Sequence, residues 1–215
     1  MTYATPAFIA MFAAIARSMD ANRDHLCALD GVIGDADHGI AMQQGFAAVD
    51  KALGTLDPAL ASPTDVFNTA AKAFLNAVGA SSGPLYATAM MRAGAALKGK
   101  ATASADDVAQ LIPAMTKGIA DRGKATPGDK TMLDAWQAAA DTVNGLKGQD
   151  APLGQVLAQA VAAAEAGAQA TIAMEAKLGR SARLGQRSVG HIDAGAASAA
   201  LVIKAMADSL GAAGG

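Results

Sequence analysis

The sequence predicts an all-α fold, an up-and-down antiparallel bundle or closed barrel of about eight helices. Hydrophobic residues make up 52% of the chain but aromatic residues only 4%, so Ala, Leu, Met and Val must form most of the core. This composition favours closely packed helices over a β-sandwich. Apolar residues recur at helical spacing, and no segment reads convincingly as a strand. Because the segments between these helices are short, consecutive helices are expected to be antiparallel neighbours.

Helix start and stop signals place the helices along the chain. Thr5 followed by Pro6 begins the first helix, which is expected to run towards Leu29 and deliver Asp30 to a loop. The later helices begin mostly at Ser, Thr, Asp or Pro, and several end at a Gly. Their expected ranges are about 38–53, from 62–65 to 79, 84–99, from 104 through 119, about 131–146, 152–179, and from 193 or 198 into the Gly-rich tail.

Apolar stripes on these helices predict the core. Residues 132–146 carry such a stripe, and residues 66–77 and 108–119 carry similar ones. Trp136 is therefore expected in the core, and the isolated His25 on a helix surface. A chain of 215 residues can bury one sizeable core, so residues 1–215 are expected to form one domain.

Charge and cysteine content exclude several classes of function. The net charge is -2 and the chain has no basic run, so no nucleic-acid partner is expected. Apolar stretches such as 194–203 are too short and too rich in Ala and Gly to span a membrane, so no membrane partner is expected. Cys27 is the single cysteine, which precludes an internal disulfide, and no charged start leads into an apolar signal segment. A cytoplasmic location is therefore expected.

Residues 30–39 contain three carboxylates, a histidine and three glycines. Asp30, Asp35 and Asp37 are spaced so that a continuous helix would point them in different directions. They are expected to converge from a loop, whose backbone freedom comes from its glycines. Mg²⁺ prefers hard oxygen ligands and shares them with substrate phosphates, so the stretch is interpreted as a site for two Mg²⁺ ions and a polyphosphate.

The alternative interpretation of this stretch is an acidic surface turn that caps the next helix. Asp37 and His38 are expected to contribute to such a cap in either case. An EF-hand is excluded, because a calcium loop that opened at Asp35 would have Phe46 instead of Glu at its twelfth position.

Three further blocks are candidate anion sites. Residues 79–83 place two serine hydroxyls and free backbone N–H groups before a helix; a Ser-rich linker is the alternative. Residues 179–187 contain three arginines that can engage phosphate oxygens; a solvated basic loop is the alternative. Residues 123–131 come close to a Walker A loop, but Asp129 stands where that loop needs Lys and no strand precedes it, so this interpretation is rejected.

The expected order of helices brings these blocks together. They precede the second, fourth, sixth and eighth helices, and every second connection of an up-and-down bundle falls at the same end. One composite site at one rim is therefore expected.

Residues 33–39 (Ile-Gly-Asp-Ala-Asp-His-Gly) resemble the signature of the nucleotide-binding L subunit of dihydroxyacetone kinase. The similarity recurs in order at residues 79–86, 123–134 and 179–195. It implies an eight-helix barrel that binds ADP or ATP at one rim, with two Mg²⁺ ions on the three aspartates. It assigns to the nucleotide the residues His38, Gly39, Ile40, Ala41, Ala80, Ser81, Ser82, Gly123, Met132, Arg180, Asp193, Ala194 and Gly195. Met132 is expected against the base, with core packing as the alternative.

The chain departs from the usual family pattern at three positions. Arg183 stands where Tyr is typical, and Ile192 and Ala194 stand where Gln and Pro are typical. These differences leave the local loop shape and the partner surface open.

The resemblance also implies the partners. A separate K subunit holds the ketone substrate, while this chain presents the phosphoryl donor and has no catalytic residue assigned to it. In one branch of the family the donor is bound ADP recharged by a phosphotransferase-system protein, the M subunit; in another, ATP exchanges from solution. Dihydroxyacetone, another small ketose or a polyol all remain open as substrates.

Three alternatives to this function are considered. A magnesium-dependent phosphate-ester hydrolase would use the same carboxylates to activate water. A helical ligand-binding or lipid-binding bundle would leave the acidic stretch structural. A fatty-acid kinase domain shares the carboxylate spacing, but the Asp-Ala-Asp-His form favours the dihydroxyacetone branch.

Overall fold

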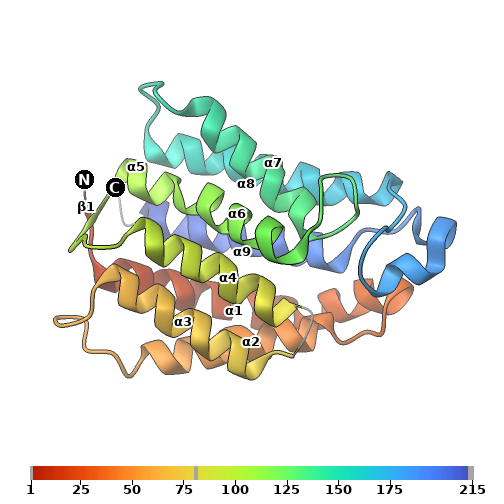
Figure 1. Ribbon diagram of the computed structural model, residues 1–215, viewed down its shortest axis with the longest axis horizontal. Coiled ribbons are helices and arrows are strands. Elements are labelled where there is room, and N and C mark those ends of the chain that lie inside the picture. Colours follow the sequence, from red (N-terminus) through yellow and green to blue (C-terminus); the bar gives the residue numbers. More distant parts are fainter. Residues whose placement is uncertain (1, 80–81, 213–215) are drawn as a thin grey trace.

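In the computed structural model, residues 2–79 and 82–212 are described (Figure 1). The α-helices in this part of the chain are α1 (Thr5–Ile33), α2 (His38–Leu53), α3 (Pro63–Ala77), α4 (Ser82–Ala96), α5 (Ala105–Ala109), α6 (Leu111–Gly123), α7 (Met132–Leu146), α8 (Leu153–Ala170) and α9 (Ala194–Ala212). Two 3₁₀ segments, η1 (Thr171–Ala173) and η2 (Arg180–Ser188), lie between α8 and α9. Two short strands, β1 (Thr2–Tyr3) and β2 (Ala103–Ser104), pair antiparallel.

The long helices form a closed ring. Following the chain from α1 to α9, each long helix packs against the next, with α4 contacting α6 directly, and α9 returns to pack on α1. The predicted all-α, up-and-down barrel is therefore confirmed. The β1–β2 pair, α5 and the end of α9 lie at one end of the barrel. The ends of α1, α3 and α6, the starts of α2, α4 and α7, and η2 lie at the other (Figure 1).

Local signals set several helix starts as predicted. Ser62 caps α3 through a reciprocal pair of hydrogen bonds with Asp65, and Thr131 and Asp134 make the equivalent capping box on α7. The bounds of α2 match the predicted range.

Three boundaries differ from the prediction. The helix expected from 104 through 119 is split into α5 and α6 at Gln110, because the ring of Pro113 clashes with a helical carbonyl four residues earlier. Helix α8 ends at Ala170 instead of near 179, and Thr171 turns the chain by donating its hydroxyl to the Ala168 carbonyl at 2.6 Å. Helix α1 continues past Leu29 to Ile33, because burying Ile33 outweighs the cost of about 1 kcal/mol for Gly31 within a helix. The two-residue strands were not predicted, since they are too short to show a period.

Side chains fill the interior of the barrel. Aromatic rings contact one another within two groups. One group is Phe8, Phe12 and Phe67, and the other is Phe46, Phe74, Tyr86 and Trp136. Trp136 is fully buried and His25 is exposed on α1, so both predictions are confirmed. None of the described helices is long and apolar enough to cross a lipid bilayer.

Candidate functional site

The four connections at one end of the barrel meet around a single pocket of about 260 Å³. Its lining comes from all four blocks singled out in the sequence and includes Asp30, Ile33, Asp35, Asp37, His38, Ser82, Leu85, Ile119, Gly123, Ala125, Lys130, Thr131, Met132, Leu178, Gly179, Arg180, Ser181, Asp193, Ala194 and Gly195. The expected composite site at one rim is thus present.

Three carboxylates cluster on one side of this pocket. Asp30, Asp35 and Asp37 each offer an oxygen atom, and these atoms lie within 4.8 Å of one another. Asp30 does not come from a loop, as expected, but from the last turn of α1; only the other two acids lie in the connection to α2. Gly34 lets the chain turn back over Asp30, because a Cβ at this position would overlap the Asp30 carboxylate.

Asp30 also forms the cap of α2. One of its oxygens, Oδ2, accepts from the backbone N–H of Asp37 at 3.0 Å and of His38 at 3.3 Å. The side chain of Asp37 makes no capping hydrogen bond, so the expected cap by Asp37 and His38 is wrong and Asp30 fills that role. Its position is thereby fixed by α1 and by α2 together.

The acid cluster fits Mg²⁺. All three donors are carboxylate oxygens, the hard ligands that Mg²⁺ prefers, and their spacing allows them to share a centre. Among the described residues this is the one group of three His, Cys, Asp or Glu side chains close enough to hold a metal ion.

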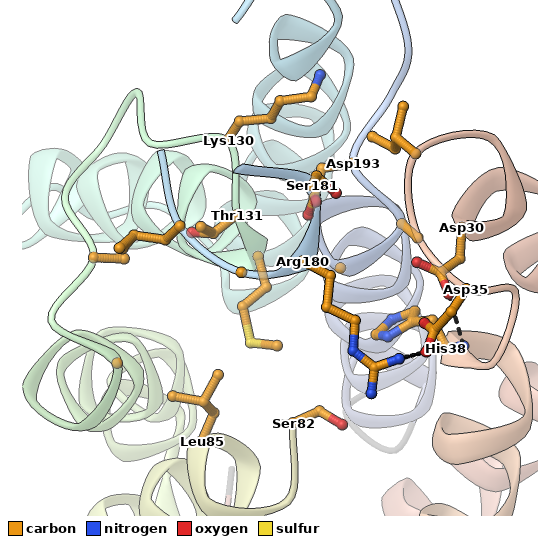
Figure 2. Close-up of a pocket in the computed structure, with 18 of the residues that line it drawn as sticks. Asp30, Asp35, His38, Ser82, Leu85, Lys130, Thr131, Arg180, Ser181 and Asp193 are labelled. Carbon is orange, nitrogen blue, oxygen red and sulfur yellow. Dashed lines mark hydrogen bonds and ion pairs between the residues drawn. The ribbon is translucent and has the colours of Figure 1, made fainter. Parts of the chain in front are cut away.

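Arg180 reaches from η2 into the acid cluster (Figure 2). Its guanidinium makes an ion pair with Asp35 and a second one with Asp37 at 3.3 Å. The side chain is about half exposed, so solvent and ligands have access to it. A cation held here between carboxylates and an open pocket is well placed to meet an anionic ligand group.

His38 lies at the start of α2, partly buried beside the cluster. Burial lowers the pKa of its imidazole, and the negative charge of Asp30 opposes this effect. Its Nε2 lies 2.8 Å from the hydroxyl oxygen of Ser198 on α9. Sequence reasoning considered Ser198 only as a possible start of the last helix and gave it no role in the site; α9 begins earlier, at Ala194.

Lys130 is a second residue that sequence reasoning missed. It is 1% exposed, and its ammonium donates to the carbonyls of Thr171, at 2.5 Å, and His191. Burial lowers the pKa of Lys130, while the charges of Asp193 and Asp134 oppose the shift. Lys130 therefore ties the start of α7 to both ends of the segment that carries Arg180.

Asp193 faces Lys130 at the base of the same segment. Burial raises the pKa of its carboxyl to about 6, although the Ala196 N–H and the charge of Lys130 oppose the shift. The Ala196 N–H donates to Asp193 at 2.7 Å, and the Asp193 N–H donates to the Thr171 hydroxyl at 3.0 Å.

The other side of the pocket is apolar. Leu85, Ile119, Ala125 and Met132 line it, and Figure 2 shows Leu85 on α4 across the pocket from the acids. A Cβ on Gly123 would lie 3.0 Å from Leu85, so a glycine there keeps the space open. The pocket can hold an amphipathic ligand with a flat apolar group at one end and anionic groups at the other.

Residues 32–208 of the chain match the family model described as DAK2 domain. The chain belongs to the DAK2 domain family. It is 37% identical over 186 residues to the ADP-binding subunit DhaL of the PEP-dependent dihydroxyacetone kinase of Escherichia coli, covering 86% of this chain and 87% of that relative. It is 40% identical over 185 residues to the corresponding subunit of kinase 1 of Listeria innocua, with 86% of each chain covered. The resemblance inferred from the four sequence blocks is thus confirmed.

Solved structures show the same fold. The dihydroxyacetone kinase of C. freundii matches 96% of this chain with a TM-score of 0.73 and 24% identity. The same enzyme in complex with AMP-PNP and Mg²⁺ matches 97% with a TM-score of 0.72 and 25% identity. This DAK2 domain spans 35% of the length of either solved chain.

The DAK2 domain brings most of the predicted site residues together. Those that line the pocket are Asp30, Asp35, Asp37, His38, Ser82, Gly123, Met132, Arg180, Asp193, Ala194 and Gly195. Met132 also packs against the core, as the alternative for it expected, and its contact with a nucleotide base stays a prediction. Ala80 and Ser81 lie outside the described residues.

Three predicted residues are not among those that line the pocket. Gly39 is buried where α2 crosses α1, and a Cβ there would overlap the backbone oxygen of Arg23. Ile40 is 45% exposed, and Ala41 packs against the core. The structure therefore gives Gly39 a role in packing the DAK2 domain.

The three departures from the family pattern lie in different surroundings. Arg183 lines a shallow hollow outside the main pocket, between the end of α1 and η2. Ile192 is partly buried against the core, and Ala194 lines the main pocket.

Proposed function

We propose that this chain is the ADP-binding subunit of a dihydroxyacetone kinase, which presents a nucleotide phosphoryl group to a substrate held on a separate K-type subunit. The observation that carries the proposal is the cluster of three carboxylates beside Arg180, in a pocket whose opposite wall is apolar. The names of the relatives from E. coli and L. innocua, each an ADP-binding subunit, support the same conclusion.

In this proposal Asp30, Asp35 and Asp37 hold two Mg²⁺ ions. Bound there, Mg²⁺ would neutralise phosphate charge and stabilise the charge that develops during phosphoryl transfer. The C. freundii enzyme has been solved in complex with AMP-PNP and Mg²⁺, which supports this combination of ligands. One oxygen of Asp30 already caps α2, whereas Asp35 and Asp37 pair with the side chain of Arg180.

The remaining contacts follow from the two sides of the pocket. Arg180 engages phosphate oxygens with its planar fork of N–H groups, and Ser82, at the first turn of α4, adds a hydroxyl. Leu85 and Met132 face the nucleotide base.

The names of the relatives also point to the source of the phosphoryl group. They are PEP-dependent or, in Lactococcus lactis, PTS-dependent kinases whose subunit is named for ADP. We therefore favour ADP as a bound cofactor that a phosphotransferase-system M subunit recharges. Dihydroxyacetone is the favoured acceptor because these relatives are named as dihydroxyacetone kinases. The human triokinase/FMN cyclase is 36% identical to this chain over 187 residues, which are 32% of that longer relative.

Native mass spectrometry of the purified chain tests the choice of cofactor. Co-purified ADP with Mg²⁺ is expected; an empty chain that takes up and exchanges ATP would favour the branch of the family that uses ATP from solution.

An assay with ATP, Mg²⁺ and dihydroxyacetone tests whether the site is divided between two subunits, because positioning of the acceptor can contribute about 7 to 11 kcal/mol. We expect no turnover by the chain alone, and turnover once a K-type subunit and a phosphoryl-donor protein are added. Phosphate release by the isolated chain would instead support a magnesium-dependent hydrolase.

A further inference from the structure

A short hydrogen-bonded chain runs from the pocket into the wall of the barrel. His38 lines the pocket, and its Nε2 lies 2.8 Å from the hydroxyl oxygen of Ser198. Ser198 is fully buried on α9, and its hydroxyl lies 2.9 Å from the carbonyl oxygen of Gly195. The imidazole is thereby held against a single buried hydroxyl.

The protons in this chain can be assigned from its members. The Gly195 carbonyl can only accept, so the proton between it and Ser198 belongs to the serine. A hydroxyl has one proton, and Ser198 must therefore accept a hydrogen bond from His38. Nε2 of His38 then carries a proton, and in the neutral ring Nδ1 carries a lone pair.

The interior side of Ser198 fits this assignment. The Tyr86 hydroxyl is near Ser198, and it and the Trp136 N–H are the two buried side-chain polar atoms of the described residues without a partner at hydrogen-bond geometry. The second lone pair of Ser198 is open to a donor on this side. The serine therefore needs no further proton there, and its own proton stays directed at the Gly195 carbonyl.

We propose that Ser198 is a positioning residue that fixes His38 as its Nε2–H tautomer, so that His38 presents a hydrogen-bond acceptor to the ligand. The inference rests on the proposed function for the identity of that ligand. An acceptor beside three carboxylates disfavours a phosphate oxygen and favours an O–H donor. Water on a bound Mg²⁺ ion and a hydroxyl of the nucleotide both have this chemistry.

The tautomer can be measured directly in the ligand-free protein by ¹H–¹⁵N correlation of the imidazole ring at pH 8, where an ordinary imidazole is neutral. The chain has three histidines, so Gln substitutions of His25 and His191 assign the His38 signals. We expect one tautomer, protonated on Nε2. A ring protonated on Nδ1, or an equal mixture, would overturn the proposal, whatever nucleotide the protein binds.

Two substitutions connect the tautomer to binding. Ser198→Ala should give a mixture of tautomers and weaken ADP binding in the presence of Mg²⁺ by about five-fold, the effect of one ordinary hydrogen bond. Ser198→Thr keeps a hydroxyl that can reach the carbonyl three residues earlier and should restore both. Thr116→Val, which removes a buried hydroxyl from α6, is the matched control and should change neither.

The results separate this inference from the proposed function. An unchanged tautomer and affinity in Ser198→Ala, or an equal loss of affinity in Thr116→Val, would contradict the role of Ser198. Loss of ADP binding by the parent protein would contradict the proposed function, while the tautomer measurement would still decide the inference. Repeating the titration with ADP and 2′-deoxy-ADP tests whether the donor is the 2′-hydroxyl or water on Mg²⁺. If it is the 2′-hydroxyl, the parent should bind 2′-deoxy-ADP more weakly than ADP, and Ser198→Ala should bind the two equally. If it is the water, the change from ADP to 2′-deoxy-ADP should affect both proteins alike.

Discussion

The ammonium of Lys130 lies 2.5 Å from the carbonyl oxygen of Thr171, a contact between residues 41 positions apart. It also donates to the His191 carbonyl, so one buried cation holds both ends of the segment that carries Arg180. This contact makes the shape of the pocket depend on a residue that sequence reasoning passed over.

Lys130→Met should therefore destabilise the protein and loosen this segment. Two buried carbonyls would lose their donor, at about 1 to 3 kcal/mol each. Urea unfolding measures the loss of stability, and amide hydrogen exchange should rise in residues 171–193 before the rest. Lys204→Met is the control, because this lysine pairs with Asp208 between two exposed side chains and its loss should cost less than about 1 kcal/mol. Equal stability of the two variants would rule out the anchoring role.

Substitution of Arg180 should strengthen the binding of Mg²⁺ alone but weaken the binding of ADP with Mg²⁺. The guanidinium pairs with Asp35 and Asp37, so its removal frees these acids and should strengthen binding of Mg²⁺ alone. ADP binding with Mg²⁺ should weaken by about ten-fold in the Lys variant and further in the Ala variant, because Lys cannot make paired contacts. Arg187→Lys, in the same segment, is the control. Calorimetry that gave one affinity for all variants would mean that Arg180 is a solvated loop residue.

Gly123→Ala should affect the nucleotide but not the metal. The added Cβ would approach Leu85 at 3.0 Å and narrow the apolar side of the pocket, at a cost of about 1 kcal/mol in ADP binding. Gly145→Ala on α7 is the control: its Cβ would meet open space, while the gain in helix propensity is the same. An unchanged ADP affinity in Gly123→Ala would place the base elsewhere.

Asp193 should make stability depend on pH. Its pKa is about 6 in the folded protein against an ordinary value of 3.8, so the folded state keeps a proton that the unfolded state loses. The contribution of this group is fully present below about pH 4 and is lost as the pH rises towards 6 and beyond, by at most about 3 kcal/mol. Asp193→Asn should remove this decline and be more stable than the parent at pH 7.5. Urea unfolding at pH 4.5 and 7.5 measures it, with the exposed Asp150→Asn as control; parallel curves for all three proteins would contradict the assignment.

Much of this architecture could be predicted from the sequence because its signals are local. Capping residues, glycines and apolar stripes set most helix bounds, and the order of short connections is enough to place four blocks at one rim. The sequence predicts a loop at Asp30 because the spacing of the three acids would point them apart on a helix, whereas the burial of Ile33 extends the helix past Asp30. Lys130 and Ser198 could not be found, since their roles depend on contacts with residues 41 to 160 positions away.

The thermal shift produced by ADP and Mg²⁺ in Asp35→Asn and Asp37→Asn tests the central claim most directly. Both acids have little buried apolar contact, so the helices should persist; Asp30 is left intact because it also caps α2. At a ligand concentration of 100 times Kd, binding stabilises the parent by about 2.7 kcal/mol. The parent and Asp208→Asn, a surface control on α9, should show the full rise in melting temperature, and the two site variants little or none. Equal shifts in all four proteins would contradict the assignment of these carboxylates to the metal.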